Sequence, residues 1–471
     1  MTLITSIDQL KPALALQRSA FAHQPYPEYT SRVAQLKKLK ALVLNHQQAF
    51  IDAMSQDFGH RSSDDSRIGD ILTTVAGINY SLKRLKGWMK AKSRHVGLLF
   101  QPASASVMYQ PLGVIGIIVP WNYPLFLALG PLTAAFAAGN RAMLKMSEHT
   151  PATSQLLAEL LAQSFPAEQV TVVGGAADVA AAFSALPFDH LFFTGSTQVG
   201  RQVMRAAAEN LVPVTLELGG KSPAIIAPEM DVSTAVSRMI LGKTLNSGQT
   251  CVAPDYVLCP ADKVNELVVE FTTRFNQLFP EIAENRDYSC MINASQYQRL
   301  QQGLAQAASL GALLIPLSKE PTQQLQRKIP LTLLLHGTDE MQLMQQEIFG
   351  PVLPIVSYEK LQDAITYVNQ RPRPLALYLY SFDAKTQQQV MRQTHAGGVC
   401  LNDAAFHVAI DDLPFGGVGP SGMGQYHGEE GFKNFSCAKS VLKKGRISLT
   451  PLLFPPYGRW IHKLVYRLFI R

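Results

Sequence analysis

An alternation of strand-like and helix-like runs, beginning at residue 114, limits the possible folds of this chain more than any other feature. Residues 114–119 form a fully apolar, largely β-branched run, typical of a strand in the middle of a parallel sheet. Further strand-like runs lie at 141–146, 169–173, 190–193, 214–218 and 224–227, with Ala- and Leu-rich helical runs between several of them. This pattern predicts βαβ units and a doubly wound α/β sheet, whose ligands lie at the carboxyl ends of the strands.

A second series of the same kind extends from residue 231 to about 400. It has helical runs at 235–245 and 264–278 and apolar runs at 256–259, 331–335, 352–356 and 375–380. The first 95 residues are mainly helical in pattern, and a short strand-like stretch follows at 104–110. At 471 residues the chain is long enough for two or three cores, so we expect two α/β domains.

The most apolar window, 123–139, has nearly the length of a membrane span. It contains Pro124, Gly130 and Pro131, so a buried helix is the better interpretation. The N-terminus carries Asp8 and Lys11 among its apolar residues and lacks the core of a signal peptide. Five widely spaced cysteines without a CxxC pair argue against a disulfide framework and a zinc site, and no metal is predicted. We expect a reducing, cytoplasmic location.

Charge is concentrated in the C-terminal tail. The net charge is +7, and residues 443–471 contain seven Lys or Arg and no Asp or Glu, so the rest of the chain is neutral by this count. A general nucleic-acid-binding surface is therefore not predicted. In the tail, Arg459, Lys463, Arg467 and Arg471 recur every four residues with apolar residues between them. Such a helix can bind weakly to a membrane surface, here the inner face of the membrane. Alternatively, it docks on the body of the protein or on a dimer partner.

Three polar residues stand beside apolar strand-like runs. Asn122 follows the run at 114–119 between two prolines, Glu217 lies inside the run at 214–218, and Cys251 ends the loop Gly248-Gln249-Thr250. Burial would raise the pKa of Glu217 towards a value useful for a general base. Each residue also has an ordinary interpretation: turn chemistry for Asn122, a structural carboxylate for Glu217, and a small buried hydrophobe for Cys251.

A glycine loop, 193–200, lies between a strand-like run and a helical run. Such a loop presents backbone N–H groups and a helix N-terminus to a phosphate. Its spacing is GxxxxG without the lysine of a nucleotide-triphosphate loop, and it is not GxGxxG. An ordinary tight turn explains the loop alone equally well.

Six motifs in one order resemble the aldehyde dehydrogenase superfamily. They are PWNYP at 120–124, FTGST at 193–197, LELGGKSP at 216–223, GQTC at 248–251, EIFGP at 347–351 and PFGGVGPSGMG at 414–424. The short chain and the LKMSE version of the cofactor motif at 144–148 are similar to the class 3 branch and, within it, to bacterial coniferyl-aldehyde dehydrogenases. The common family form has Pro at the position of Met146.

The resemblance implies catalytic roles for three residues. Cys251 would be the nucleophile, in a site that favours its thiolate, and would form first a thiohemiacetal and then a thioester. The Asn122 amide and the Cys251 backbone N–H would hold the oxyanion. Glu217 would activate the water that hydrolyses the thioester.

The resemblance also implies a dinucleotide site. Lys145 and Glu148 would bind the adenosine ribose, and Gly195 with Ser196 the pyrophosphate. Glu347 and Phe349 would bind the nicotinamide ribose and ring, with Trp121 also on the cofactor. A carboxylate beside the ribose hydroxyls should repel a 2′-phosphate, which favours NAD, with NADP as the alternative. In isolation, Glu347 is better explained as a solvated glutamate.

The expected organisation follows the same resemblance. An NAD-binding domain would span 1–222, interrupted by a β extension at about 98–110, and a catalytic domain 223–403. A return segment with an oligomerisation strand would span 404–442 and the basic tail 443–471. The extension, completed by 435–442, would join two subunits in a homodimer.

The implied reaction is NAD(P)-dependent oxidation of an aromatic or long-chain aldehyde, such as coniferaldehyde, to the acid. Phe406 and His407 are candidates for the rim of the aldehyde tunnel. Two rival functions stay open: a relative that transfers the acyl group to coenzyme A or works reductively, and a non-catalytic protein on the same fold.

Overall fold

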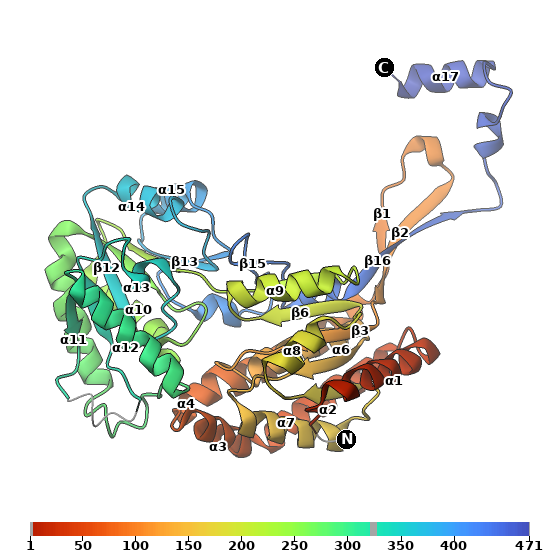
Figure 1. Ribbon diagram of the computed structural model, residues 1–471. Coiled ribbons are helices and arrows are strands. Elements are labelled where there is room, and N and C mark those ends of the chain that lie inside the picture. The colour runs from red at the N-terminus through yellow and green to blue at the C-terminus, as the bar shows by residue number, and fades with distance from the viewer. Residues whose placement is uncertain (1–2, 321–326, 471) are drawn as a thin grey trace.

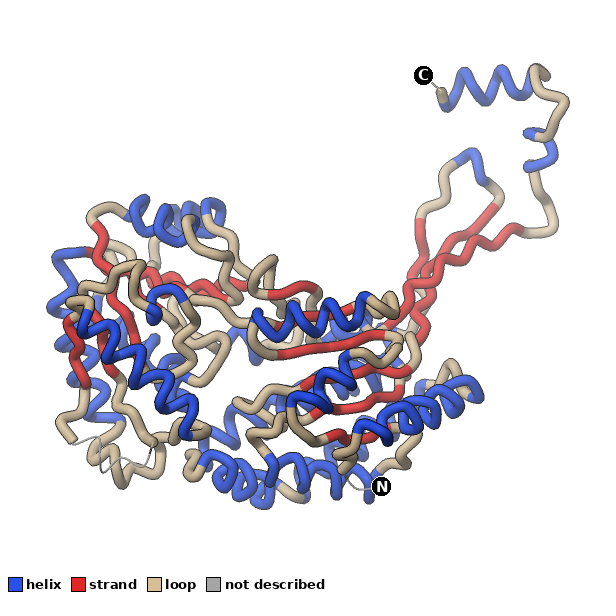
Figure 2. Tube along the Cα trace, viewed as in Figure 1, coloured by secondary structure: helices blue, strands red, loops and turns tan. Residues whose placement is uncertain are grey.

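The computed structural model describes residues 3–320 and 327–470. Its strands form three sheets, two of them inside α/β layers and one small sheet that projects from the body (Figures 1 and 2). The expected fold class, two doubly wound α/β domains with a β extension, is confirmed.

The first large sheet has the strand order β15-β7-β6-β3-β4-β5. All its pairings are parallel except that of β15 with β7. Because β4 and β5 lie on one side of β3 and β6 and β7 on the other, the direction of winding reverses between β3 and β6. The strands are β3 (Val114–Ile118), β4 (Arg141–Lys145), β5 (Val170–Val173), β6 (His190–Thr194), β7 (Val214–Glu217) and β15 (Gly422–Met423).

Helices cover both faces of this sheet, and the strand alternation decides which residues each face buries. Ile115 and Ile117 pack into one core, whereas Val114 and Ile118 pack into another. The helices of this part are α1 (Leu10–His23), α2 (Tyr29–Asn45), α3 (Gln47–Phe58), α4 (Ser63–Ser66), α5 (Thr73–Trp88), α6 (Phe126–Ala138), α7 (Pro151–Ser164), α8 (Ala177–Ser184) and α9 (Thr197–Ala208), with a π-helical turn at Arg67–Leu72.

The predicted buried helix is α6, whose side chains are buried at all but two positions. Within the described residues, no helix combines the length and apolarity needed to cross a membrane.

The second large sheet has the strand order β10-β11-β12-β9-β8-β13-β14 and is parallel except at β10. Its strands are β8 (Pro223–Ile226), β9 (Tyr256–Pro260), β10 (Leu313–Pro316), β11 (Thr332–Leu335), β12 (Val352–Tyr358), β13 (Ala376–Tyr380) and β14 (Gly398–Leu401). Its helices are α10 (Val232–Thr244), α11 (Val264–Leu278), α12 (Ala294–Ser309), α13 (Gln342–Gln345), α14 (Leu361–Asn369) and α15 (Ala384–Gln393).

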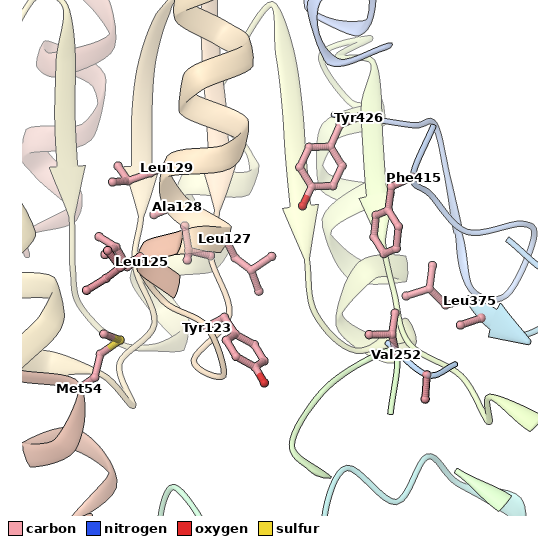
Figure 3. Packing of buried hydrophobic residues seen from close by; sticks show 14 of the residues in the cluster. Met54, Tyr123, Leu125, Leu127, Ala128, Leu129, Val252, Leu375, Phe415 and Tyr426 are labelled. Carbon is pink, nitrogen blue, oxygen red and sulfur yellow. The ribbon is translucent and has the colours of Figure 1, made fainter. Parts of the chain in front are cut away.

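The two large sheets share one continuous core. Tyr123 and Leu125, next to the first sheet, belong to the same buried cluster as Val252 and Leu375 of the second part (Figure 3). Apolar contact across this boundary fixes how the two sets of strand ends face each other.

The projecting sheet is antiparallel and consists of β1 (Lys92–Arg94), β2 (Ala103–Pro111) and β16 (Ser436–Lys444). Strand β1 has no signal in the sequence, because its three residues have polar side chains. They form a strand through their pairing with Ser106 and its neighbours. Beyond α16 (Gly428–Asn434) and β16, the chain ends in α17 (Trp460–Phe469), which stands apart from the body in Figure 1.

Candidate active site

Predicted site residues gather where the carboxyl ends of the strands meet the second domain. Asn122 lies in the loop that follows β3 and precedes α6, and Glu217 is the last residue of β7. The carbonyl oxygen of Glu217 accepts a hydrogen bond from Gly195 N at 3.0 Å, so β7 and the glycine loop after β6 are joined. These positions correspond to the ligand-binding edge of a doubly wound sheet.

The loop before Cys251 has an unusual backbone that is held by its own side chains. Asn246 and Ser247 have φ values of 49° and 53°, in the left-handed region that L-residues rarely adopt. The Gln249 amide donates to the carbonyl oxygens of Asn246 and Cys290, both at 3.0 Å, and accepts from Ile292 N at 3.0 Å. This buried amide therefore ties the loop to the chain around residue 291.

Gly248 is required for close packing of the same loop. Its φ is 74°, and a Cβ there would lie 2.7 Å from the carbonyl oxygen of Gly350. Any other residue would have to move backbone atoms.

Cys251 and Asn122 line one apolar cavity of about 370 Å³. No charged side chain of the described residues is part of its wall, which includes Ile68, Leu72, Phe126, Leu241, Leu245, Phe406 and Val408. The polar Tyr123 and Thr250 satisfy each other, since their hydroxyl oxygens are 3.0 Å apart. The cavity thus offers one thiol and one amide within a largely apolar wall.

The mouth of the cavity is apolar as well. Phe406 is 48% exposed and lines the cavity, as the rim prediction expects. The same prediction is wrong for His407, which does not line the cavity and instead packs its ring against Tyr378 and Phe415. Both residues lie on a 3-10 turn, where neighbouring side chains point in different directions.

Glu217 is buried and unpaired. Its side chain is 3% exposed, and neither carboxyl oxygen has a hydrogen-bond partner among the described residues. Burial therefore raises the pKa of Glu217 well above its usual value. Its negative charge would act on Cys251 and on Tyr426, which places the three groups near one another.

Burial also controls the Cys251 thiol. It raises the pKa of Cys251 to about 12, and the carboxyl groups of Glu347 and Glu217 add to the increase. The raised pKa therefore contradicts the expectation that the site favours the thiolate. Loop chemistry alone suggests a reactive cysteine, whereas desolvation holds the proton on sulfur and the two neighbouring carboxyl groups add to this effect when they are ionised.

Glu347 lies beside the glycines that follow β7. The Gly220 backbone N–H donates to its carboxyl group, and a Cβ at Gly219 would overlap that group. Burial, with a smaller effect from Asp255, raises the pKa of Glu347 to about 8. The residue lines a second cavity of about 400 Å³, together with Thr197, Arg201, Gly219 and Lys221.

Phe349 and Trp121 form an aromatic pair near this junction. Phe349 has a φ of 48°, and its ring meets that of Trp121 edge to face, with centroids 5.1 Å apart and an interplanar angle of 83°. Both side chains are half-buried. A flat ring could therefore contact them, which is compatible with the predicted cofactor roles.

The other predicted cofactor residues lie at the ends of β4 and β6. The Lys145 ammonium donates to the carbonyl oxygens of Met146 at 2.7 Å and Gly175 at 2.9 Å, which leaves one of its three N–H groups. Burial lowers the pKa of Lys145, and the carboxylates of Glu148 and Asp178 oppose that change. Met146 N donates to Val173 O at 2.8 Å, a hydrogen bond that proline cannot form.

Ser196 is the N-cap of α9, and its hydroxyl oxygen accepts from Val199 N at 3.3 Å. A Cβ at Gly195 would lie 2.6 Å from the Phe193 ring, so any larger residue would have to displace that ring. This glycine turn at a helix N-terminus fits a phosphate group.

Two buried residues near the site lie outside the six motifs. Tyr426 is buried near Glu217 and Cys251, and Lys243 is buried on α10, where desolvation lowers its pKa to about 8 and Asp255 and Glu347 oppose the change. A lysine inside the otherwise apolar face of 235–245 was the one signal that could have identified Lys243.

The family model for the aldehyde dehydrogenase family matches residues 6–441. The chain belongs to the aldehyde dehydrogenase family. It is 57% identical, over 99% of its length and 97% of the relative's, to a probable coniferyl aldehyde dehydrogenase of Pseudomonas aeruginosa. Among solved structures, it matches a substrate-bound Staphylococcus aureus AldH with a TM-score of 0.93 and 35% identity, covering 99% and 100% of the two chains.

A Mycobacterium tuberculosis aldehyde dehydrogenase in complex with NAD+ matches with a TM-score of 0.85 and 30% identity. The match covers 95% of this chain and 92% of that one. The recognition of the family from its six motifs is thus confirmed.

The effect of Glu347 on the thiol can be measured by alkylation of Cys251 with iodoacetamide. Glu347 ionises near pH 8, so below that pH it is as neutral as glutamine and Glu347→Gln should react like the wild type. Above pH 8 the wild-type carboxylate opposes thiolate formation, and the variant should react severalfold faster at pH 9, since one unit of thiol pKa is about tenfold in thiolate.

The exposed Glu340→Gln serves as the matched control and should leave the rate unchanged. Equal rates for Glu347→Gln and the wild type at pH 9 would show that Glu347 does not act on the thiol.

Proposed function

We propose that this protein oxidises an apolar aldehyde to the carboxylic acid with NAD(P)+, through a thioester on Cys251. The observation that carries the proposal is the shared cavity of Cys251 and Asn122, with the buried, unpaired carboxyl group of Glu217 close to the thiol. Nucleophile, oxyanion donor and base are the three groups that this chemistry requires.

In the first step the Cys251 sulfur attacks the aldehyde carbonyl carbon. The Asn122 amide and the Cys251 backbone N–H donate hydrogen bonds to the oxygen as its negative charge develops. One such donor is worth about 2.7–4 kcal/mol in comparable sites. The thiol proton has to leave first, to solvent water, and the raised pKa of Cys251 makes this deprotonation costly.

Bound NAD(P)+ supplies the hydride acceptor that turns the thiohemiacetal into a thioester. Lys145 and Glu148 would hold its adenosine ribose, Gly195 and Ser196 its pyrophosphate, and Glu347, Phe349 and Trp121 its nicotinamide end. The donor at Lys145, the glycine turn before α9 and the cavity of about 400 Å³ beside Glu347 fit such a group. The carboxylate of Glu148 favours NAD over NADP.

Glu217 then takes a proton from the water that hydrolyses the thioester. An ordinary glutamate is too weak a base for this task at neutral pH, and burial makes Glu217 a stronger one. A hydrolytic base argues against transfer of the acyl group to coenzyme A.

The wall of the cavity supports an aromatic or long-chain aldehyde, and we infer coniferaldehyde as the first candidate. Its apolar side chains contribute roughly 25 cal/mol for each Å² of apolar surface that they bury. The relative from Pseudomonas aeruginosa carries the name of a coniferyl aldehyde dehydrogenase, which supports the same choice.

The catalytic assignment is tested by NADH formation with a panel of aldehydes, with and without coenzyme A. Cys251→Ala should abolish turnover, because no thiohemiacetal can form. Glu217→Gln should give an NADH burst of about one equivalent followed by very slow turnover, because acyl-enzyme accumulates.

Normal turnover by Cys251→Ala would refute the assignment of the nucleophile. Loss of the burst in Glu217→Gln would show that Glu217 also acts before hydrolysis. A strict requirement for coenzyme A would favour the acyl-transferring alternative.

We also propose a homodimer joined through the projecting sheet. Its outer strand β16 is nine residues long and almost fully exposed, and a long exposed edge strand tends to pair with another chain. Sedimentation equilibrium should give twice the chain mass of 51.7 kDa, and the chain mass itself would contradict the proposal.

For the tail, we propose a weak contact with an anionic membrane surface. Helix α17 exposes Trp460 and Leu468 to 74% and 55%, beside the basic Lys463 and Arg467. An apolar face next to basic residues fits the interface of an anionic bilayer, and no acidic residue follows position 442 to oppose it.

Co-sedimentation with phosphatidylglycerol vesicles tests the tail. Deletion of 454–471 should abolish binding, as should Trp460→Ser combined with Leu468→Ser, and 1 M salt should weaken it because the charges are screened. Unchanged binding after the deletion would exclude the membrane role, and loss of the dimer instead would assign the tail to the partner subunit.

A further inference from the structure

Three charged side chains from one short segment lie between the Asn122 loop and the Cys251 loop. Arg61 and Asp70 are fully buried, and Asp65 is half-buried. They come from the stretch between α3 and α5, which carries no motif and no assigned role. Because buried charges are costly unless they are paired and hydrogen-bonded, their partners indicate what they hold.

Asp70 holds the segment that follows Asn122. One carboxyl oxygen accepts from Leu125 N at 3.1 Å and Phe126 N at 3.0 Å, at the start of α6. The other accepts from Arg61 at 2.9 Å. The Arg61 guanidinium also lies over the Tyr123 ring, 4.9 Å from its centroid. Asp70 and Arg61 thus fix the chain on the C-terminal side of Asn122.

Asp65 holds the nucleophile loop. Its Oδ2 accepts from Asn246 N at 3.0 Å and from the Ser289 hydroxyl at 3.0 Å. Asn246 is the first of the two residues of this loop with left-handed φ and lies five positions before Cys251. Its side-chain amide donates to the Asn122 carbonyl oxygen at 3.1 Å. Asn246 therefore connects the two loops, and Asp65 fixes its backbone.

We propose that Asp65, acting through Asn246, is a positioning residue that sets the Asn122 amide at the correct distance from the Cys251 sulfur. This inference rests on the proposed function, in which these two groups act on the aldehyde carbonyl. Without the carboxylate, the Asn246 N–H loses its partner and the strained backbone can relax, which moves both loops. A shift of about 1 Å at such a site can cost about 100-fold in rate.

The expected defect is confined to the reaction with the aldehyde. Among the described residues, no hydrogen bond joins this network to Lys145 or Ser196, which would hold the adenosine ribose and the pyrophosphate. Trp121, next to Asn122, is the one predicted cofactor residue that adjoins the network. Cofactor affinity should therefore stay constant while formation of the thiohemiacetal slows. A purely structural role would reduce stability and affinity together.

The experiment compares full-length Asp65→Ala, Asp65→Asn and Asp64→Ala. Asparagine keeps an oxygen that can accept from Asn246 N, whereas alanine has none. Asp64 is the matched control, because its exposed carboxylate one residue earlier pairs, among the described residues, only with the surface residue Arg67. The measurements are the rate of the NADH burst, kcat and KM for the aldehyde, the Kd for NAD+ from fluorescence quenching, and thermal unfolding.

We expect Asp65→Ala to slow the burst at least about tenfold with the Kd for NAD+ within twofold, Asp65→Asn to recover most of the rate, and Asp64→Ala to match the wild type. A wild-type burst rate in Asp65→Ala would overturn the proposal, as would a parallel loss of NAD+ binding. If the wild type forms no NADH with any aldehyde, the proposed function fails instead.

Asn246→Gly covers the case in which Asp65→Ala does not fold. Glycine accepts the left-handed φ and removes only the amide that donates to Asn122 O. The same slow burst is expected, and a wild-type rate would overturn the proposal.

Discussion

Desolvation of ionisable groups at the junction of the two sheets is the constraint on which the chemistry of this protein depends. Glu217, Cys251 and Glu347 all have raised pKa values, and burial is the largest cause for each. The continuous core that joins Tyr123 to Val252 lies beside Cys251 and contributes to this desolvation. The same packing that stabilises the fold therefore also sets the protonation states at the site.

This burial has opposite consequences for the base and for the nucleophile of the proposed reaction. It makes Glu217 a stronger base, and it makes Cys251 a weaker acid. Electrostatic repulsion between the thiolate and the two carboxylates would oppose the ionisation of each group, so the site disfavours more than one negative charge. A cationic cofactor would shift this balance towards the thiolate, since a nearby positive charge stabilises an anion.

Local sequence patterns predicted those site residues whose positions depend on an adjacent strand or loop. Asn122 and Glu217 could be located because each follows or ends an apolar strand run, and Cys251 because its loop contains Gly248, which close packing requires. Asp65 could not be recognised, since a charged residue in a helical run is normally solvated, and for Lys243 the only signal was its place in an otherwise apolar helical face. The thiolate expectation failed because burial raises the pKa of the Cys251 thiol, and carboxyl groups 34 and 96 residues away in sequence add to that increase.

The sequence by itself determined the alternation of strands and helices, the burial of α6 and the loops at the strand ends, because side-chain periodicity and turn chemistry act over a few residues. Only the tertiary structure decided which strand ends face each other, that His407 turns away from the cavity, and that β1 completes the projecting sheet. It also decided the pKa values, because burial and charge proximity arise from segments far apart in the chain.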